Sequence, residues 1–154
     1  MERIKVLKLN HFDQELPLPR YETSEAAGAD IRASLPGEQR GTGLVIKPGE
    51  RVLVPTGLAM EIPLGFELQV RPRSGLSLKT PLLVVNSPGT IDSDYRGEIK
   101  IILGNFGTDD FVIKHGERVA QLVFAPVHQA TFESEDSLSS TERGSGGFGS
   151  TGMA

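Results

Sequence analysis

The chain has 154 residues, 38% of them hydrophobic, and a formal net charge of −4. These values fit one domain with a modest core and exclude a broadly basic surface for nucleic acid or anionic membranes. It has no cysteine, which excludes disulfides and thiolate metal sites and suits a reducing cytoplasm. The first ten residues lack the apolar run of a signal peptide and no segment is apolar over a membrane-spanning length, so we expect a cytoplasmic protein without membrane contact.

Apolar and polar side chains alternate with a period of two along several short segments, and this pattern predicts strands. The segments are 3–9, 66–70 and 98–103, and short β-branched runs at 81–85 and 110–113 are further strand candidates. Ten prolines and eighteen glycines leave no room for a long helix, and we expect only a brief one over 73–79, between Pro72 and Pro81. Many short strands separated by turn signals predict an all-β fold, a sandwich, barrel or jelly roll.

The segment "IKPGERV" at 46–52 matches "IKHGERV" at 113–119 in six of seven positions. We interpret the match as a shared hairpin turn, with Gly49 and Gly116 at positive φ, because too little else repeats for a duplication. After Val127 the chain becomes polar, acidic and serine-rich, and it closes on the glycine-rich "RGSGGFGSTG". We therefore divide it into a β domain, residues 1–127, and a C-terminal arm, residues 128–154.

Five segments carry residues suited to chemistry, and the first two are "AAGADIRAS" and "RPRSGLSLK". In the first, Asp30 can contact a hydrated Mg²⁺ or serve as a buried capping aspartate beside a tight turn. In the second, Gly75 permits a turn and Ser74 is expected to cap the short helix. With Arg73 alongside, the helix start suits a phosphate, and the alternative is a capped turn with a solvated arginine.

The third segment, "NSPGTIDSDYRGEIK" at 86–100, is flanked by apolar strands and predicts a β-hairpin. Free backbone groups at its mouth can hydrogen-bond the edge of a base as a strand partner would. In extended chain Asp92 and Asp94 share a face and Tyr95 points the other way. One of these acids near a bound triphosphate can deprotonate water, and the alternative is a polar hairpin tip with solvated acids.

The last two segments are "GERVAQLVF" at 116–124 and the glycine-rich tail. The first is a core strand in which Gln121 is either a satisfied strand residue or a ligand donor. The tail offers free backbone N–H groups, two hydroxyls and an arginine to an anion, and Phe148 can stack on a flat partner such as a base. It lacks the lysine, strand and helix of a Walker loop. A disordered low-complexity tail is the alternative.

Taken together and in this order, the five segments resemble the five motifs of trimeric deoxyuridine triphosphatases (dUTPases), over essentially the whole chain. The resemblance implies a homotrimer of jelly-roll-like β subunits (a β-clip) with active sites at the subunit interfaces. It implies hydrolysis of dUTP to dUMP and pyrophosphate, with Mg²⁺ bound to the triphosphate. This reaction keeps uracil out of DNA and supplies dUMP for thymidylate synthesis.

The resemblance also implies roles for residues of the third motif. Asp92 would be the general base that orients water toward the α-phosphorus, near the sugar 3′-hydroxyl, and Tyr95 would pack under the deoxyribose, leaving no space for a 2′-hydroxyl. Uracil would be read, and a 5-methyl group rejected, by a tight hairpin comprising Asn86, Gly89, Thr90 and Ile91. Lys100 would line the site from the following strand.

The remaining motifs would handle the phosphates. The triphosphate would be held by Arg73, Ser74 and Gly75, with Gln121 nearby. Asp30 would act through metal-bound water or by supporting the site. The arm would close over the nucleotide with Arg143, Phe148, Gly149, Ser150 and Thr151, Phe148 stacking on uracil and the hydroxyls meeting the γ-phosphate.

Three alternatives remain. A dCTP deaminase would share the fold, but it needs a glutamate base facing cytosine, and "GTIDSDYRG" with the glycine-rich tail favours the hydrolase. A non-catalytic jelly-roll interaction module would bind no nucleotide and leaves the order of the motifs unexplained. A general phosphate-binding module would not distinguish dUTP from UTP or dTTP.

Overall fold

The computed structural model describes residues 2–147 and has almost only β structure. The strands are β1 Lys5–Lys8, β2 Arg20–Tyr21, β3 Gly28–Arg32, β4 Leu44–Ile46, β5 Arg51–Glu61, β6 Phe66–Arg71, β7 Leu82–Val84, β8 Gly89–Ile91, β9 Glu98–Asn105, β10 Phe111–Ile113 and β11 Arg118–Pro126. A 3₁₀ turn covers Gly37–Gln39, and one helix, α1, covers Ser74–Lys79. The all-β prediction is confirmed.

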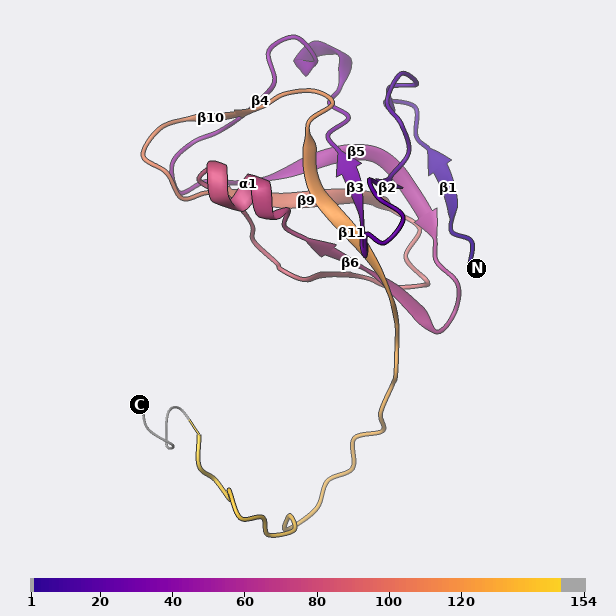
Figure 1. Cartoon of the computed structure of the whole chain (residues 1–154), viewed down its shortest axis with the longest axis vertical. Helices are drawn as coiled ribbons and strands as arrows, with labels where there is room; N and C mark the ends of the chain where they lie inside the picture. The colour runs from indigo at the N-terminus through magenta and orange to yellow at the C-terminus, as the bar shows by residue number, and fades with distance from the viewer. Residues whose placement is uncertain (1, 148–154) are drawn as a thin grey trace.

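The strands form two larger antiparallel sheets and one small one. One sheet has the order β1-β5-β9-β7, the second β2-β3-β11-β6-β8, and the third pairs β10 with β4. After β11 the chain leaves the body and runs away from it without further strands or helices as far as residue 147 (Figure 1). Phe132, on this segment, is 96% exposed.

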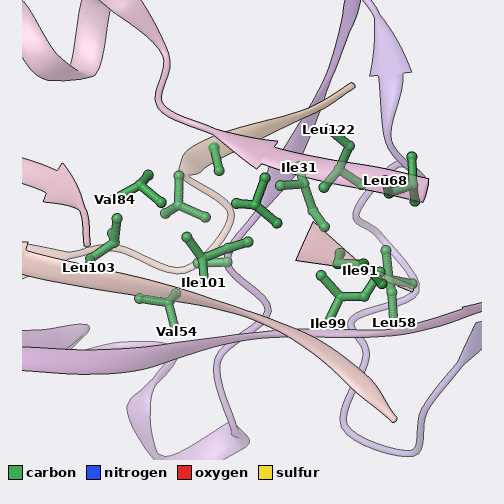
Figure 2. Close-up of a cluster of buried hydrophobic side chains, with 14 of the residues drawn as sticks. Ile31, Val54, Leu58, Leu68, Val84, Ile91, Ile99, Ile101, Leu103 and Leu122 are labelled. Atoms are coloured by element: carbon green, nitrogen blue, oxygen red, sulfur yellow. The ribbon is translucent and has the colours of Figure 1, made fainter. Parts of the chain in front are cut away.

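The core lies between the two larger sheets, which contribute to one cluster of buried side chains. Figure 2 shows Ile101 and Val54 from one sheet and Ile31 from the other within this cluster. Along β9 every second side chain is buried, at Ile99, Ile101 and Leu103. Each such side chain contributes about 1.5–3 kcal/mol on burial. Because strand side chains alternate, the residues between them, including Lys100, lie on the outer face.

The short helix predicted over 73–79 is present, but the expected cap is not. Arg73 has extended backbone angles and occupies the N-cap position without a side-chain cap bond, and Ser74 is the first helical residue. The hydroxyl of Ser74 is thus one position too late to act as the cap. Within residues 2–147, no helix is long and apolar enough to cross a membrane.

The segment at 86–100 differs from a simple hairpin. The flanking strands β7 and β9 do pair, with Val84 opposite Leu103. Between them, however, β8 crosses to the other sheet and pairs with β6, with Thr90 opposite Gln69. A cis peptide bond joins Ser87 and Pro88 just before β8. The segment therefore spans the gap between the two sheets instead of folding back on itself.

The repeated "IK-GERV" segments form two similar turns with the predicted positive φ, but neither is the predicted hairpin turn. Gly49 has φ of 73° and Gly116 has φ of 80°, which glycine adopts without steric cost. In each turn the following glutamate, Glu50 or Glu117, accepts a hydrogen bond from the backbone N–H three residues earlier. Each turn joins strands that are not paired with each other, since β4 pairs with β10.

A bulge in β5 brings three parts of the chain together at Glu98. The register of β5 on β9 shifts between Pro55 and Ala59, and Gly57, inside the shift, has φ of 68°. The N–H of Gly57 donates to Oε1 of Glu98 at 2.8 Å. Nε2 of His11, in the N-terminal loop, lies 2.9 Å from the same oxygen. Bulges of this kind redirect a strand and its side chains.

The pKa of Glu98 reflects this setting. Burial raises the pKa of its carboxyl, but hydrogen bonds from His11 and Gly57, with the nearby charge of Lys100, hold the net value below 4.5. The ionised form is therefore more stable in the folded chain than in the unfolded one. Its contribution to stability is complete above about pH 4.5 and is lost as the pH falls through the lower folded value.

Substituting Glu98→Gln tests this contribution. We expect the free energy of unfolding to fall by about 1 kcal/mol at pH 7, because a neutral acceptor replaces a charged one. The difference from the wild type should shrink below about pH 4.5, as measured by thermal melts between about pH 7 and pH 4. Glu61→Gln, which breaks an exposed pair with Lys5, should have a much smaller effect. A Glu98→Gln deficit that stays constant with pH would contradict this account.

Candidate functional site

A cavity of about 380 Å³ opens where the 86–100 segment crosses between the sheets. It is lined by Leu53 of β5, Val70 of β6, and Asn86, Gly89, Thr90, Ile91, Asp92, Tyr95, Glu98, Ile99, Lys100 and Ile102. Seven of the predicted site residues are among these: Asn86, Gly89, Thr90, Ile91, Asp92, Tyr95 and Lys100. The structure thus brings every predicted site residue of the third motif to one cavity, and the roles of the individual residues remain predictions.

The wall formed by β8 is mostly backbone. Gly89 lies opposite Val70, and a β-carbon on it would come within 2.9 Å of Nδ2 of Asn86 and 3.3 Å of Cβ of Val70. A larger residue at this position would have to displace Asn86 or Val70, so glycine suits the close approach. Among the described strands, β8 pairs only with β6. Its outer edge offers backbone donors and acceptors to a flat ligand, as an edge strand offers them to another strand.

Asp92 and Tyr95 face the same cavity because the chain turns between them. The N–H of Tyr95 donates to the carbonyl of Asp92 at 3.2 Å, which closes a β-turn. Asp94 lines a different hollow, together with Asp92 and the loop before β6. The prediction that Tyr95 points away from Asp92 was wrong because it assumed extended chain, whereas Asp92 and Asp94 do line one hollow together.

Two residues that the sequence analysis missed hold Tyr95 in place. The Tyr95 hydroxyl donates to the carbonyl of Glu98 at 3.0 Å. The ring lies so close to Gly97 that a β-carbon there would approach Cε2 of Tyr95 to 3.0 Å. The sequence carries one signal of this contact: Gly97 stands directly before β9 and two residues after Tyr95. Glu98 also approaches Lys100, with Oε2 3.5 Å from Nζ.

The residues of the first, second and fourth motifs gather around Arg73. Nε of Arg73 donates to Oδ1 of Asp30 at 2.7 Å, and Nη1 of Arg118 donates to Oδ2 at 3.0 Å. The Asp30 side chain is 11% exposed. Gln121 lies opposite Asp30 on the paired strand β11, and its Nε2 donates to the carbonyl of Pro72 at 2.9 Å. The sequence analysis missed Arg118, which starts β11.

A second cavity, of about 390 Å³, lies beside this group. Arg73, Gly75, Lys79 and Arg118 line it, giving it several cationic side chains. Ser74 is exposed at the start of α1. The first and second cavities share no lining residue. On one chain, therefore, the carboxylate of Asp92 and the arginine cluster belong to separate sites.

Direct metal coordination does not fit the side chains that the structure describes. Residues 2–147 contain no group of three or more His, Cys, Asp or Glu side chains placed to hold a metal ion. Both oxygens of Asp30 accept hydrogen bonds from arginines. A Mg²⁺ bound through the phosphates of a ligand and its own water shell needs no such cage.

The predicted residues of the tail fall mostly beyond the described chain. Arg143 is described, and its Nε donates to the carbonyl of Gly146 at 2.9 Å within the extended segment after β11. Phe148, Gly149, Ser150 and Thr151 lie outside the described residues.

Three comparisons with known proteins agree. The dUTPase family model matches residues 14–152. Deoxyuridine 5′-triphosphate nucleotidohydrolase from Roseobacter denitrificans is 61% identical over 140 residues, covering 91% of this chain and 90% of its own. The protein of the same name from Dinoroseobacter shibae is 55% identical over 149 residues, covering 97% and 96%.

A solved structure is also similar over its full length. A G164S mutant of the dUTPase of Staphylococcus bacteriophage 80alpha, with dUpNHpp, has a TM-score of 0.83 at 26% identity, covering 99% of each chain. The family model and the curated relatives span nearly all of this sequence, and they show that the chain belongs to the dUTPase family.

Proposed function

We propose that the chain hydrolyses dUTP to dUMP and pyrophosphate through attack of water on the α-phosphorus. The observation that carries the proposal is the cavity beside β8, which combines a strand edge, an aromatic ring and an exposed carboxylate. Family membership supports the same reaction. Removing dUTP limits uracil in DNA, and the dUMP formed supplies thymidylate synthesis.

The shape of the cavity suits a deoxyuridine. At about 380 Å³ it lies in the size range of small-ligand pockets. The edge of β8 would hydrogen-bond uracil, with Asn86 alongside, and the tight turn around Gly89 would reject a 5-methyl group. Tyr95, held by its bond to Glu98, would support the sugar and exclude a 2′-hydroxyl.

Asp92 would take the proton of the attacking water. Within residues 2–147 its side chain accepts no hydrogen bond and is exposed at the cavity, so the carboxylate is available to a water molecule. The new bond joins the water oxygen to the α-phosphorus. The bond from that phosphorus to the bridging oxygen breaks, and pyrophosphate leaves with the electron pair.

The charge of the triphosphate requires cations. Arg73, with Ser74, Gly75 and Gln121 beside it, would supply one contact, and Arg143, Phe148, Gly149, Ser150 and Thr151 would close over the nucleotide from the arm. A Mg²⁺ bound to the phosphates supplies further neutralisation of the developing charge. The arm would order only on the nucleotide, since ordering costs about 1–2 kcal/mol per residue without it.

A homotrimer would unite these groups, because one chain keeps them in separate cavities. Large apolar side chains remain exposed on and beside the β1-β5-β9-β7 sheet, with Leu53 59% and Phe106 77% exposed. Val85 belongs to the same patch, since it bonds to β9 through Ile102. Exposed apolar patches of this kind mark association surfaces.

The reaction is tested by pyrophosphate release from dUTP, dCTP, UTP and dTTP in parallel, with and without Mg²⁺. We expect release from dUTP at rates far above the other three. Ammonia release from dCTP would identify a deaminase instead. Equal activity on all four nucleotides would mean that the protein recognises only the phosphates. No activity on dUTP would overturn the proposal.

Replacing Asp92→Asn should lower kcat by about 10²–10⁴-fold, the usual contribution of a general base. Affinity for the non-hydrolysable α,β-imido analogue of dUTP should change little, as measured by calorimetry. Asp94→Asn is the matched control, since Asp94, unlike Asp92, does not line the first cavity, and it should retain near wild-type turnover. If Asp92→Asn lost affinity as much as turnover, Asp92 would be structural.

A shared site predicts complementation between inactive variants. Asp92→Asn and Arg73→Ala chains, unfolded together and refolded at equal ratio, should regain about a quarter of wild-type activity, because a site needs one intact residue from each of two subunits. Light scattering should report a trimer for each variant alone. Activity no higher than the sum of the separate variants would place both residues in one chain's site.

A further inference from the structure

We propose that Asp30, Arg118 and Gln121 form a bracket that positions Arg73 for the triphosphate, and that Asp30 and Arg118 act through Arg73 without touching substrate or metal. The inference rests on the proposed function and assigns a role to three residues around Arg73, which would bind the triphosphate. Arg118 is new to the site, and Asp30 becomes a positioning residue.

The first part of the bracket is the way Asp30 holds Arg73. The carboxylate bonds to Nε, at 2.7 Å, and among the described residues the two terminal nitrogens of Arg73 donate to no other protein group. The guanidinium is planar, so a partner on Nε determines the direction in which the terminal nitrogens point. That end of the side chain lines the cationic cavity, where it can bind a phosphate with two parallel hydrogen bonds.

The second part is the pairing of Asp30 with Arg118. Nη1 of Arg118 donates to the other carboxylate oxygen at 3.0 Å, and the same nitrogen lies 3.8 Å from Glu22. A carboxylate with one guanidinium on each oxygen is poorly suited to a divalent cation, because both neighbours repel it. Asp30 is also largely buried, and this setting favours an ion pair with satisfied oxygens.

The third part holds the backbone on which Arg73 stands. Nε2 of Gln121 donates to the carbonyl of Pro72, the residue before Arg73. Gln121 can take this position because Gly28 lies beneath it, and a β-carbon at Gly28 would overlap the side-chain oxygen of Gln121. Both the side chain and the backbone of Arg73 are therefore held before ligand arrives. Preorganised donors of this kind need no rearrangement during the reaction.

A double-mutant cycle tests the bracket in the full-length protein. The variants are Asp30→Asn, Arg118→Met and their combination, with Arg20→Met as control. Arg20 lies opposite Asp30 on β2, but its exposed guanidinium bonds to Glu22 and not to Asp30. For each we would measure the Kd of the α,β-imido analogue of dUTP, the inhibition constant of deoxyuridine, the Mg²⁺ concentration for half-maximal turnover and the melting temperature.

We expect Asp30→Asn to weaken the analogue roughly tenfold, the equivalent of one lost charge-assisted contact, and Arg118→Met to weaken it less. The double variant should match Asp30→Asn, because Arg118 acts through Asp30. Deoxyuridine, which has no phosphate, should bind as to the wild type, and the Mg²⁺ requirement should be unchanged. Gly28→Ala, which displaces Gln121, should give the same phosphate-specific loss.

Three outcomes would overturn the proposal. If the double variant weakened analogue binding by the product of the two single effects, Arg118 would contact substrate itself. A raised Mg²⁺ requirement in Asp30→Asn would make Asp30 a metal-water ligand. Equal losses of deoxyuridine and analogue binding with a lowered melting temperature would mean a purely structural role. Failure of the proposed function can be distinguished from these outcomes, because in that case the wild-type protein itself would leave dUTP intact.

Discussion

β9 pairs with β5 from Gly104, opposite Arg51, to Glu98, opposite Ala59. Its inner side chains, such as Ile101, are fully buried, so slipping the register by one residue would expose them to water. The same register determines which β9 side chains face outward and line the cavity. Core packing and cavity geometry thus depend on one strand pairing, and neither can be changed alone.

The bulge at Gly57 connects this pairing to the N-terminal loop. Its N–H and the ring of His11 both hold Glu98, and the carbonyl of Glu98 holds the ring of Tyr95. The bonds from Gly57 and His11 offset the cost of partly burying this carboxylate. The orientation of Tyr95 is therefore linked through Glu98 to parts of the chain that never reach the cavity.

Much of the fold could be predicted from the sequence where the physical cause was local. Alternating side chains indicated β9, and proline and glycine punctuation confined α1 to a few residues between Pro72 and Pro81. The crossing of β8 to the second sheet could not be predicted this way, because it depends on pairing with β6, which is distant in the chain. The turn between Asp92 and Tyr95 was missed because alternation arguments assume an extended backbone.

The site shows the same division. The motif residues Gly89 and Asp92 were recognisable as a pattern, but the reason for Gly89 is the nearness of Asn86 and Val70, which only the fold reveals. Arg118 was missed because an arginine at a strand start is ordinarily solvated. Its significance depends on Asp30, 88 positions away in sequence and bonded to it across the paired strands.

The two arginines assigned to phosphate illustrate two ways to prepare a binding site. Arg73 is held by Asp30 in the folded chain, so little of its conformational freedom remains to be lost when a ligand binds. Arg143 bonds only to a nearby carbonyl within the extended segment, so its ordering must be offset by contacts made on binding. A prearranged cation can bind the nucleotide first, and contacts from the arm then become favourable because the phosphates are already in place. In the proposed reaction, Arg73 would thus bind the triphosphate at little entropic cost, and closure of the arm would depend on a complete triphosphate.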